Sequence, residues 1–252
     1  MEQQLVSKAA QVHIGCSGWV YKHWRGLLYP EGLPQNRWFH RYAEEFDTVE
    51  INASFYRVPL EKTFEGWREK APDGFRYAVK VNRVITHFKK LIETEESLST
   101  FVGLARKLGP TLGPLLYQLP PSLKLDLDRL ENFLKLIPKD LTNVFEFRNR
   151  SWYIPETYAL LDRYAACFCI HDMPGSKTER IAVGPATYIR FHGGEGKYWG
   201  RYSDEGLLSW SDWIVEQSRS GRSVWCYFNN DMFGHALDDA QTLRSMVRQM
   251  LR

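Results

Sequence analysis

The chain has 252 residues, of which 44% are hydrophobic and 25% are charged, which is typical of a globular protein and excludes a disordered, fibrous or coiled-coil chain. A formal net charge of +3, from 33 Lys and Arg against 30 Asp and Glu, gives no whole-protein argument for binding nucleic acid. The sequence contains neither a transmembrane-length apolar run nor a signal peptide at its start. We therefore expect a cytoplasmic protein without membrane contact.

Short apolar runs alternate along the chain with segments of helical periodicity. The runs predicted as strands are 13–16, 48–51, 76–81, 115–119, 144–147, 167–171, 187–191 and 223–228. The predicted helices are 36–46, 60–70, 98–108, 130–137, 155–164, 206–220 and 237–250, with Ser97 and Asp128 as N-caps of the third and fourth. Segment 172–186 is rich in Gly and Pro and predicts a loop.

Strand–helix alternation of this kind predicts a parallel sheet, and eight strands in a chain of this length predict a single (β/α)8 TIM-type barrel, an α/β fold. We expect one domain over residues 1–252, with 1–11 as an N-terminal extension. A loop takes the place of the helix between the sixth and seventh strands. The four cysteines, Cys16, Cys167, Cys169 and Cys226, lie in apolar runs without a C-x-x-C motif, so we expect reduced, buried thiols.

Four predicted strands end in polar residues that alternate with apolar ones. Strand side chains alternate faces, so the apolar residues would face the helices and the polar ones the barrel axis. These ends lie at the carboxyl face of a barrel, where active sites of this fold are found. The polar pairs are Glu50 with Asn52, Lys80 with Asn82, Glu146 with Arg148, and Arg190 with His192, and equivalent places in the other strands hold Ser17, Gln118, Asp172 and Asn229.

Two other readings of this polar ring stay open. An antiparallel sheet with one solvated face would also alternate, although its polar residues would run along the whole strand. A structural ion-pair network could close the barrel without any chemistry, because the charges of the ring cancel.

The polar ring does not indicate a metal site. It holds few histidines, and its cations would compete with a metal for the carboxylates, so we predict no metal. No nucleotide or cofactor motif is present, and we predict no cofactor.

A glycine-rich stretch follows the seventh strand. The amides of Gly193, Gly194 and Gly196 could converge on an anion, with Lys197 or Arg201 adding charge. An ordinary flexible loop is the alternative.

Seven strings resemble the domain-of-unknown-function 72 (YecE-like) family, in the same order and over about residues 12–245. They are IGCSGWVYKHW, VEINASFYRVP, AVKVNRVITHFKKL, QLPPS, EFRNRSW, YIRFHG and YFNND. The resemblance implies a TIM-type barrel and leaves the reaction open.

The likeness of this family to metal-dependent repair nucleases is an analogy of fold only, and this sequence lacks the many His and carboxylate ligands of those nucleases. It departs from the family pattern at Cys16, where Thr is common, and at the HDMPG run. The motifs also contain Trp19, Tyr21, Tyr56 and His87, which occupy the strand-exit loops and join the candidate site.

The sequence favours an enzyme acting on a small anionic or sugar-like ligand, as a hydrolase, lyase or isomerase without a metal. Its catalytic candidates are Glu50, Lys80, Glu146, Asp172 and His192. Among them Lys80 would be a general acid or base or a charge stabiliser, and Glu50 and Glu146 would be proton carriers. The ligand-binding candidates are Ser17, Trp19, Tyr21, Asn52, Tyr56, Asn82, His87, Gln118, Arg148, Arg190, Gly193 and Asn229. Two alternatives remain: a nucleic-acid-binding or repair protein that uses the basic segment 83–90 with exposed aromatics, and a non-catalytic scaffold. The sequence predicts no oligomeric state.

Overall fold

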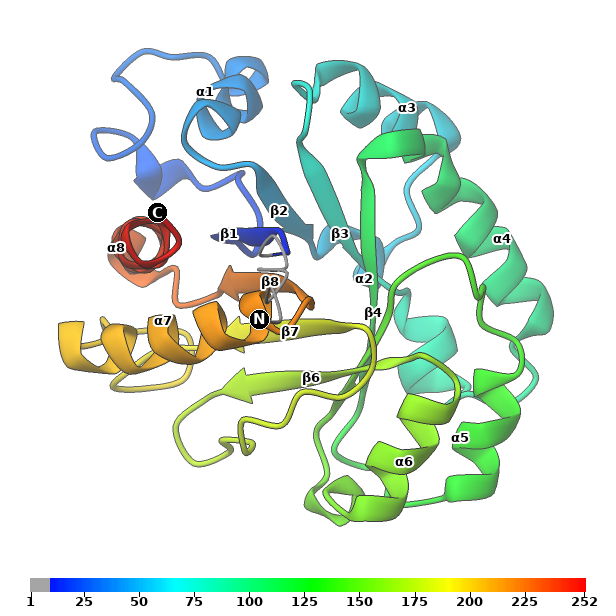
Figure 1. Cartoon of the computed structure of the whole chain (residues 1–252). Helices are drawn as coiled ribbons and strands as arrows, with labels where there is room; N and C mark the ends of the chain where they lie inside the picture. Colours follow the sequence, from blue (N-terminus) through cyan, green and yellow to red (C-terminus); the bar gives the residue numbers. More distant parts are fainter. Residues whose placement is uncertain (1–9) are drawn as a thin grey trace, which may run out of the picture.

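Eight parallel strands close into a barrel in the computed structural model, which describes residues 10–252. The strands pair in chain order, and β8 pairs with β1 to close the ring (Figure 1). The strands are β1 Val12–Cys16, β2 Thr48–Ile51, β3 Arg76–Lys80, β4 Leu112–Leu119, β5 Asn143–Phe147, β6 Cys167–Asp172, β7 Ala186–Phe191 and β8 Ser223–Phe228. The predicted TIM-type barrel is confirmed, and the antiparallel alternative is wrong.

Helices surround the barrel on its outer face (Figure 1). They are α1 Trp38–Glu45, α2 Ala53–Tyr56, α3 Glu61–Lys70, α4 Glu95–Ala105, α5 Leu127–Leu134, α6 Pro155–Arg163, α7 Asp204–Arg219 and α8 His235–Met250. The short helix α2, directly after β2, was not predicted. None of the helices within residues 10–252 is both long and apolar enough to cross a membrane.

Two predicted N-caps are wrong. Ser97 lies inside α4, whose N-cap is Thr94. The carboxylate of Asp126, not of Asp128, accepts a hydrogen bond from the amide of Arg129 (3.0 Å) and caps α5. Both helices therefore begin two or more residues earlier than the sequence indicates, because the apolar pattern does not mark the first polar turn.

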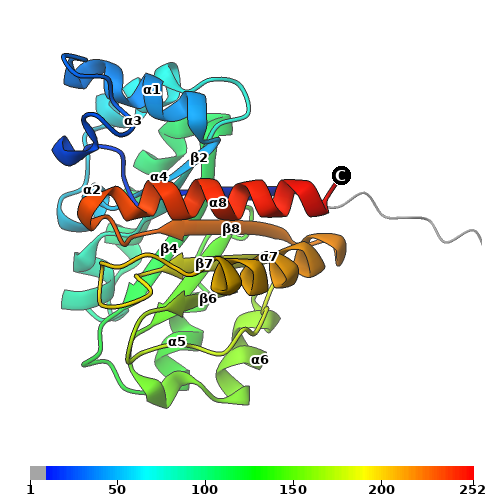
Figure 2. The ribbon, with the colours of Figure 1, turned by 90° about the vertical axis from the view of Figure 1, so that its left-hand side faces the viewer.

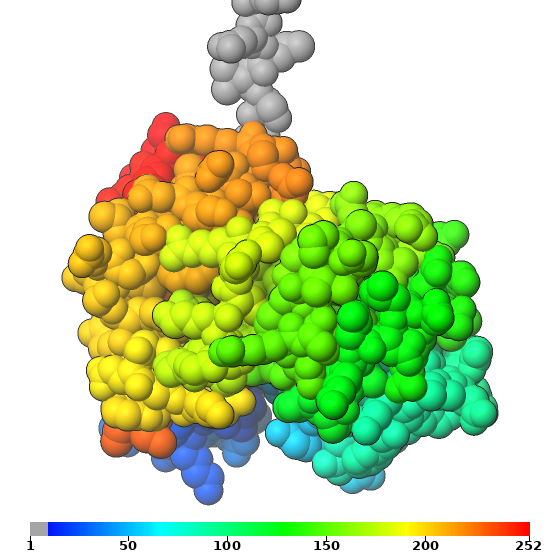
Figure 3. Space-filling view, turned by 90° about the horizontal axis from the view of Figure 1, so that it is seen from below, coloured from blue at the N-terminus to red at the C-terminus, as the bar shows by residue number. Residues whose placement is uncertain are grey.

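The connection between β6 and β7 contains no helix, as predicted. Residues 173–185 cross the outer surface between α6 and α7, where a helix would otherwise lie (Figure 3). Of the predicted N-terminal extension, residues 1–9 lie outside the described part of the chain. Ala10 and Gln11 are joined to the barrel, since the amide of Ala10 donates to the carbonyl of Ser218 (3.0 Å) and the carbonyl of Gln11 accepts from the amide of Val224 (2.9 Å).

The core has two layers. The larger lies between the strands and the helices and holds most of the buried aromatic residues. The smaller fills the barrel axis with Ala78, Leu116, Val144, Cys167, Cys169, Ala186, Tyr188, Trp225 and Tyr227. The loops after β7 and β8 extend from the end of the barrel opposite the C-terminus of α8 (Figure 2). We call this carboxyl end the mouth.

Candidate functional site

Arg190 joins two carboxylates at the mouth. It projects from β7 into the barrel, and its Nε and Nη2 donate to the two oxygens of Glu50 at 3.0 and 2.8 Å. Its Nη1 donates to Glu146 Oε2 at 2.8 Å. All three side chains are buried, with at most 1% of each residue exposed. We call Glu50, Arg190 and Glu146 the buried triad.

Neighbouring side chains complete the bonding of Glu50. Its oxygens accept hydrogen bonds from the hydroxyls of Ser17 (2.8 Å) and Tyr188 (2.7 Å) and from the amide of Asn52 (3.1 Å). Burial opposes ionisation of this carboxyl, but Arg190 and these donors outweigh it and lower its pKa. Glu50 is therefore held as a carboxylate.

Glu146 is held in the same state by different partners. Gln118 donates to its Oε2 at 2.7 Å, and Arg148 forms an ion pair with its Oε1. The imidazoles of His171 and His192 each approach Oε1 to 3.9 Å. Burial again opposes ionisation, but the charges of Arg148 and Arg190 lower the pKa of Glu146 well below its usual value.

Lys80 is the exception among the charged groups of the mouth. It projects inward from β3 with 8% of its surface exposed. Within residues 10–252 no carboxylate lies within ion-pair distance of its Nζ, and no acceptor is hydrogen-bonded to it. The nitrogen instead lies 4.1 Å from the centre of the Phe55 ring. Burial and the nearby charge of Arg190 lower the pKa of Lys80 to about 8, although Glu146 and Glu50 oppose the shift.

Three imidazoles around this site are neutral at pH 7. Burial lowers the pKa of His171 to about 4 and that of His192 well below its usual value. Burial and the charge of Lys80 lower the pKa of His87 to about 4. The ring of His87 packs edge-on against Phe55, the same ring that Lys80 contacts.

Asp172 does not belong to this site, which corrects the prediction. Its side chain points outward, where Oδ1 pairs with Lys177 (3.0 Å) and Oδ2 accepts from the indole of Trp210 (3.3 Å). Cys167 and Cys169 face the barrel axis, so alternation along β6 places His171 inward and Asp172 outward. The prediction that Asp172 faces the barrel axis is therefore wrong by one residue, because His171 takes that inward position.

Trp19 and Tyr56 also lie away from the mouth's centre. Trp19 packs against Phe39, Trp67 and Tyr77 in the layer between strands and helices. Tyr56 is 65% exposed on the rim, where the guanidinium of Arg83 lies 5.7 Å from its ring.

Asn82 bonds to the backbone of the neighbouring turn rather than facing a ligand. The amide of Asn82 donates to the carbonyls of Ser54 (2.9 Å) and Phe55 (3.2 Å), and its oxygen accepts from Val84 N. Asn82 therefore holds the turn that carries Phe55.

The predicted anion cradle in the glycine-rich loop is not formed. The amide of Gly193 donates to the hydroxyl of Tyr202 (3.2 Å), and those of Gly194 and Gly196 donate to carbonyls of the same loop. Gly193 has a φ of +116°, and a Cβ there would lie 2.2 Å from the carbonyl oxygen of Trp199. The glycine allows the backbone to fold back on itself.

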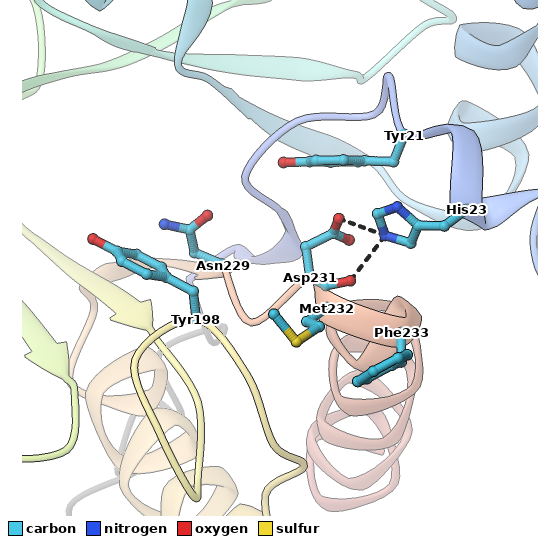
Figure 4. Close-up of a pocket in the computed structure, with 7 residues that line it drawn as sticks. All are labelled: Tyr21, His23, Tyr198, Asn229, Asp231, Met232 and Phe233. Carbon is cyan, nitrogen blue, oxygen red and sulfur yellow. Dashed lines mark hydrogen bonds and ion pairs between the residues drawn. The ribbon is translucent and has the colours of Figure 1, made fainter.

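A cavity of about 550 Å³ adjoins the mouth on the side of β1, β7 and β8. It is lined by Tyr21, His23, Tyr198, Asn229, Asp231, Met232 and Phe233 (Figure 4).

Three contacts connect this cavity to the charged site. The hydroxyl of Tyr21 donates to the carbonyl of Ser17 (2.6 Å), the amide of Asn229 lies 3.4 Å from His192 Nδ1, and the ring of Tyr198 packs edge-on against His192. His192 Nε2 in turn lies 3.0 Å from Arg148 Nη2. Tyr21, Asn229 and His192 were predicted at the mouth, and the structure joins them to it.

The polar wall of the cavity is an imidazole–carboxylate pair. His23 Nε2 lies 2.7 Å from Asp231 Oδ2 (Figure 4). The indole of Trp24 donates to Asp231 Oδ1 at 2.7 Å. Burial raises the pKa of Asp231 to about 6 despite the charge of His23.

Sequence reasoning missed His23, Phe55, His171, Tyr188, Tyr198 and Asp231. The alternation of side chains along a strand could have identified His171 and Tyr188 as inward-facing, because each lies two residues from another inward-facing side chain. The others lie in the connections after the strands, Phe55 in the short helix α2 and His23 in a single 3-10 turn, and alternation does not predict the course of these connections. Within residues 10–252 no group of three or more His, Cys, Asp or Glu side chains is placed to hold a metal ion.

Comparison with known proteins agrees with the fold over nearly the whole chain. A family model described as a protein of unknown function, DUF72, matches residues 13–252. The UPF0759 protein YunF of Bacillus subtilis is 25% identical over 94% of each chain. A DUF72 family protein of Thermotoga maritima, TM1631, superposes with a TM-score of 0.84 at 29% identity, covering 94% of this chain and 99% of its own. EF0366 of Enterococcus faecalis, at 19% identity and a TM-score of 0.81 over 94% and 96% of the two chains, shows the same fold. The family match, the barrel and the ordered motifs at its mouth agree, and the chain belongs to the DUF72 family.

Proposed function

We propose that the mouth binds a small anionic substrate and that the amine of Lys80 is its acid–base group. The observation that carries this proposal is that Lys80 has no carboxylate partner among residues 10–252. Glu50 and Glu146 balance Arg190 and Arg148, which leaves the ammonium of Lys80 as the uncompensated charge among these five groups. An anion bound beside Lys80 would supply the missing countercharge.

Arg148, which directly follows β5, is a second group that supports anion binding. Its side chain is only 10% exposed, its Nη1 meets the thioether of Met173 (3.4 Å), and its Nε has no hydrogen-bond partner within residues 10–252. A guanidinium with donors left over binds the planar oxygens of a carboxylate or phosphate well.

The carboxylates do not suit the proton-carrying role that the sequence suggested. A general acid needs a pKa near the working pH, whereas the pKa values of both Glu50 and Glu146 are lowered. Their proposed role is to fix the guanidinium groups. Lys80, with a pKa of about 8, has the value that proton transfer near neutral pH requires.

The proposed reaction class is therefore a lyase or isomerase step in which a proton moves next to an anionic or carbonyl group. Glycoside hydrolysis fits less well, because it needs one carboxyl of raised pKa beside one carboxylate. The cavity between Tyr21, Tyr198 and Phe233 would hold the apolar or ring-bearing part of the substrate.

A second candidate function rests on a different observation. On the rim, Arg83 lies 5.7 Å from the ring of Tyr56 and 5.3 Å from that of Phe88, and both rings are 65% exposed. An arginine between exposed aromatics could stack unpaired bases. Salt-dependent retention on single-stranded DNA that is lost in Arg83→Ala would favour this alternative.

The proposed function is tested by thermal denaturation with inorganic phosphate and a panel of carboxylated and phosphorylated metabolites. We expect saturable stabilisation of the wild type and of the control Lys124→Met, which changes an exposed lysine, and none of Lys80→Met. An equal shift in Lys80→Met, or no saturable shift with any anion, would overturn the proposal.

A further inference from the structure

The position of Lys80 suits covalent chemistry as well as proton transfer. Its amine lies among groups that are already paired, so no carboxylate has to be displaced before the nitrogen can react. Asn82 holds the turn that carries Phe55, and Phe55 in turn sets the place of the Nζ atom at 4.1 Å from its ring. An apolar neighbour and nearby cations are the surroundings that activate a lysine as a nucleophile.

We propose that Lys80 forms an imine with the carbonyl carbon of a substrate that also carries a carboxylate or phosphate group. This inference rests on the proposed function, because it uses the same amine and the same anion-binding side chains. It adds the class of substrate, a 2-oxo acid or a phosphorylated aldehyde or ketone, and the bond through which the substrate is held.

The step balances without an oxidant or a second substrate. The neutral amine of Lys80 attacks the carbonyl carbon as the carbon–oxygen π bond breaks, and a proton passes through water from the attacking nitrogen to the carbonyl oxygen to give a neutral carbinolamine. Loss of that oxygen as water, with one further proton, leaves a protonated imine. The amine, the carbonyl compound and one proton thus become an iminium ion and one water.

The surroundings suit both ends of this step. The iminium carries the same charge as the original ammonium and keeps its place over the face of Phe55. Lys80 ends β3 and Arg148 directly follows β5, and only β4 separates these two strands in the barrel, so a short molecule held by its anionic group at Arg148 could present its carbonyl to Lys80. The iminium then acts as an electron sink for proton removal at the neighbouring carbon, which agrees with a lyase or isomerase step.

The test is reductive trapping with the probe glyoxylate, an aldehyde that carries a carboxylate, and sodium cyanoborohydride near pH 7.5. We expect one carboxymethyl group per chain, located on Lys80 by peptide mapping, at a rate about tenfold or more above that of the exposed lysines, because far more of the Lys80 amine is neutral. Butyraldehyde, which lacks the carboxylate, should lose this preference for Lys80.

Two variants show whether the adduct forms on Lys80 itself. Lys80→Arg retains a cation but cannot form an imine, and it should lose the fast adduct, whereas Lys124→Arg should trap like the wild type. Labelling spread evenly over surface lysines would overturn the imine. If anions still stabilise the wild type through Lys80 in that case, the proposed function stands without it. If they do not, both proposals fail.

Discussion

Arg190 and Lys80 are two buried cations of one barrel with opposite surroundings. Arg190 makes three hydrogen bonds to two carboxylates, whereas the Lys80 nitrogen lies over an aromatic ring with no acceptor among the described residues. The structural-network reading of the polar ring therefore describes the buried triad well, and it leaves Lys80 unexplained. This difference predicts opposite effects of removing the two charges.

Replacing Arg190 by methionine leaves two buried carboxylates without their shared partner. We expect Arg190→Met to lower the free energy of unfolding by about 3–5 kcal/mol, measured by urea denaturation. Arg150→Met, which removes an exposed arginine, should change stability by less than about 0.5 kcal/mol. A loss of less than about 1 kcal/mol in Arg190→Met would contradict the account of the triad as a structural unit.

Replacing Lys80 by methionine should raise the free energy of unfolding near neutral pH, whereas replacing Arg190 lowers it. The pKa of Lys80 is lowered from 10.5 to about 8 in the folded protein. Between these values the unfolded chain binds the proton that the folded chain has released, so stability rises with pH. We expect the wild type to gain about 3 kcal/mol over this window relative to Lys80→Met, measured by urea denaturation of both proteins at several pH values. Parallel curves would show that Lys80 titrates normally.

At the scale of single elements, alternation located most of the charged site and failed where a strand end was ambiguous. Glu50, Glu146 and Arg190 each stand between large apolar residues that must face the helices, so their direction was predictable. In β6 the residues His171 and Asp172 are both polar, and only counting from Cys167 and Cys169 separates inward from outward. Loop residues such as Tyr198 carry no periodic signal at all.

The loop after β7 offers a prediction at this scale. Gly193→Ala places a Cβ against two carbonyl oxygens at 2.2 and 2.3 Å with a φ of +116°. We expect it to cost about 3 kcal/mol or more and to disturb Tyr198 and the adjoining cavity. Gly175→Ala has a positive φ of 77° with open space around it and should cost about 1 kcal/mol. Equal thermal stabilities of the two variants would contradict this geometry.

For the whole molecule, strand count and alternation were sufficient to predict the closed barrel, because a parallel sheet of eight strands in one short domain has few other arrangements. The cavity beside the mouth could not be predicted, since three loops far apart in the chain form it. Its walls come from residues 21–23, 198 and 229–233.

The closed barrel also predicts how the thiols behave. All four cysteines are free and buried, and burial raises the pKa of Cys167 to about 12. We expect a disulfide reagent such as Ellman's reagent to label them only as fast as the native protein opens, and urea to accelerate the reaction in step with unfolding. Immediate labelling of one thiol in native buffer would show that a strand or helix opens separately.

The titration of Lys80 decides whether this amine stands outside the ion-pair network at the mouth. In protein labelled with ¹³C at lysine Cε, the Lys80 resonance can be assigned by its loss in Lys80→Met and followed by NMR across pH. We predict a midpoint of about 8, well separated from the exposed lysines. A midpoint at or above 10.5, the ordinary value, would mean that Lys80 is paired with a carboxylate and would contradict the proposed chemistry.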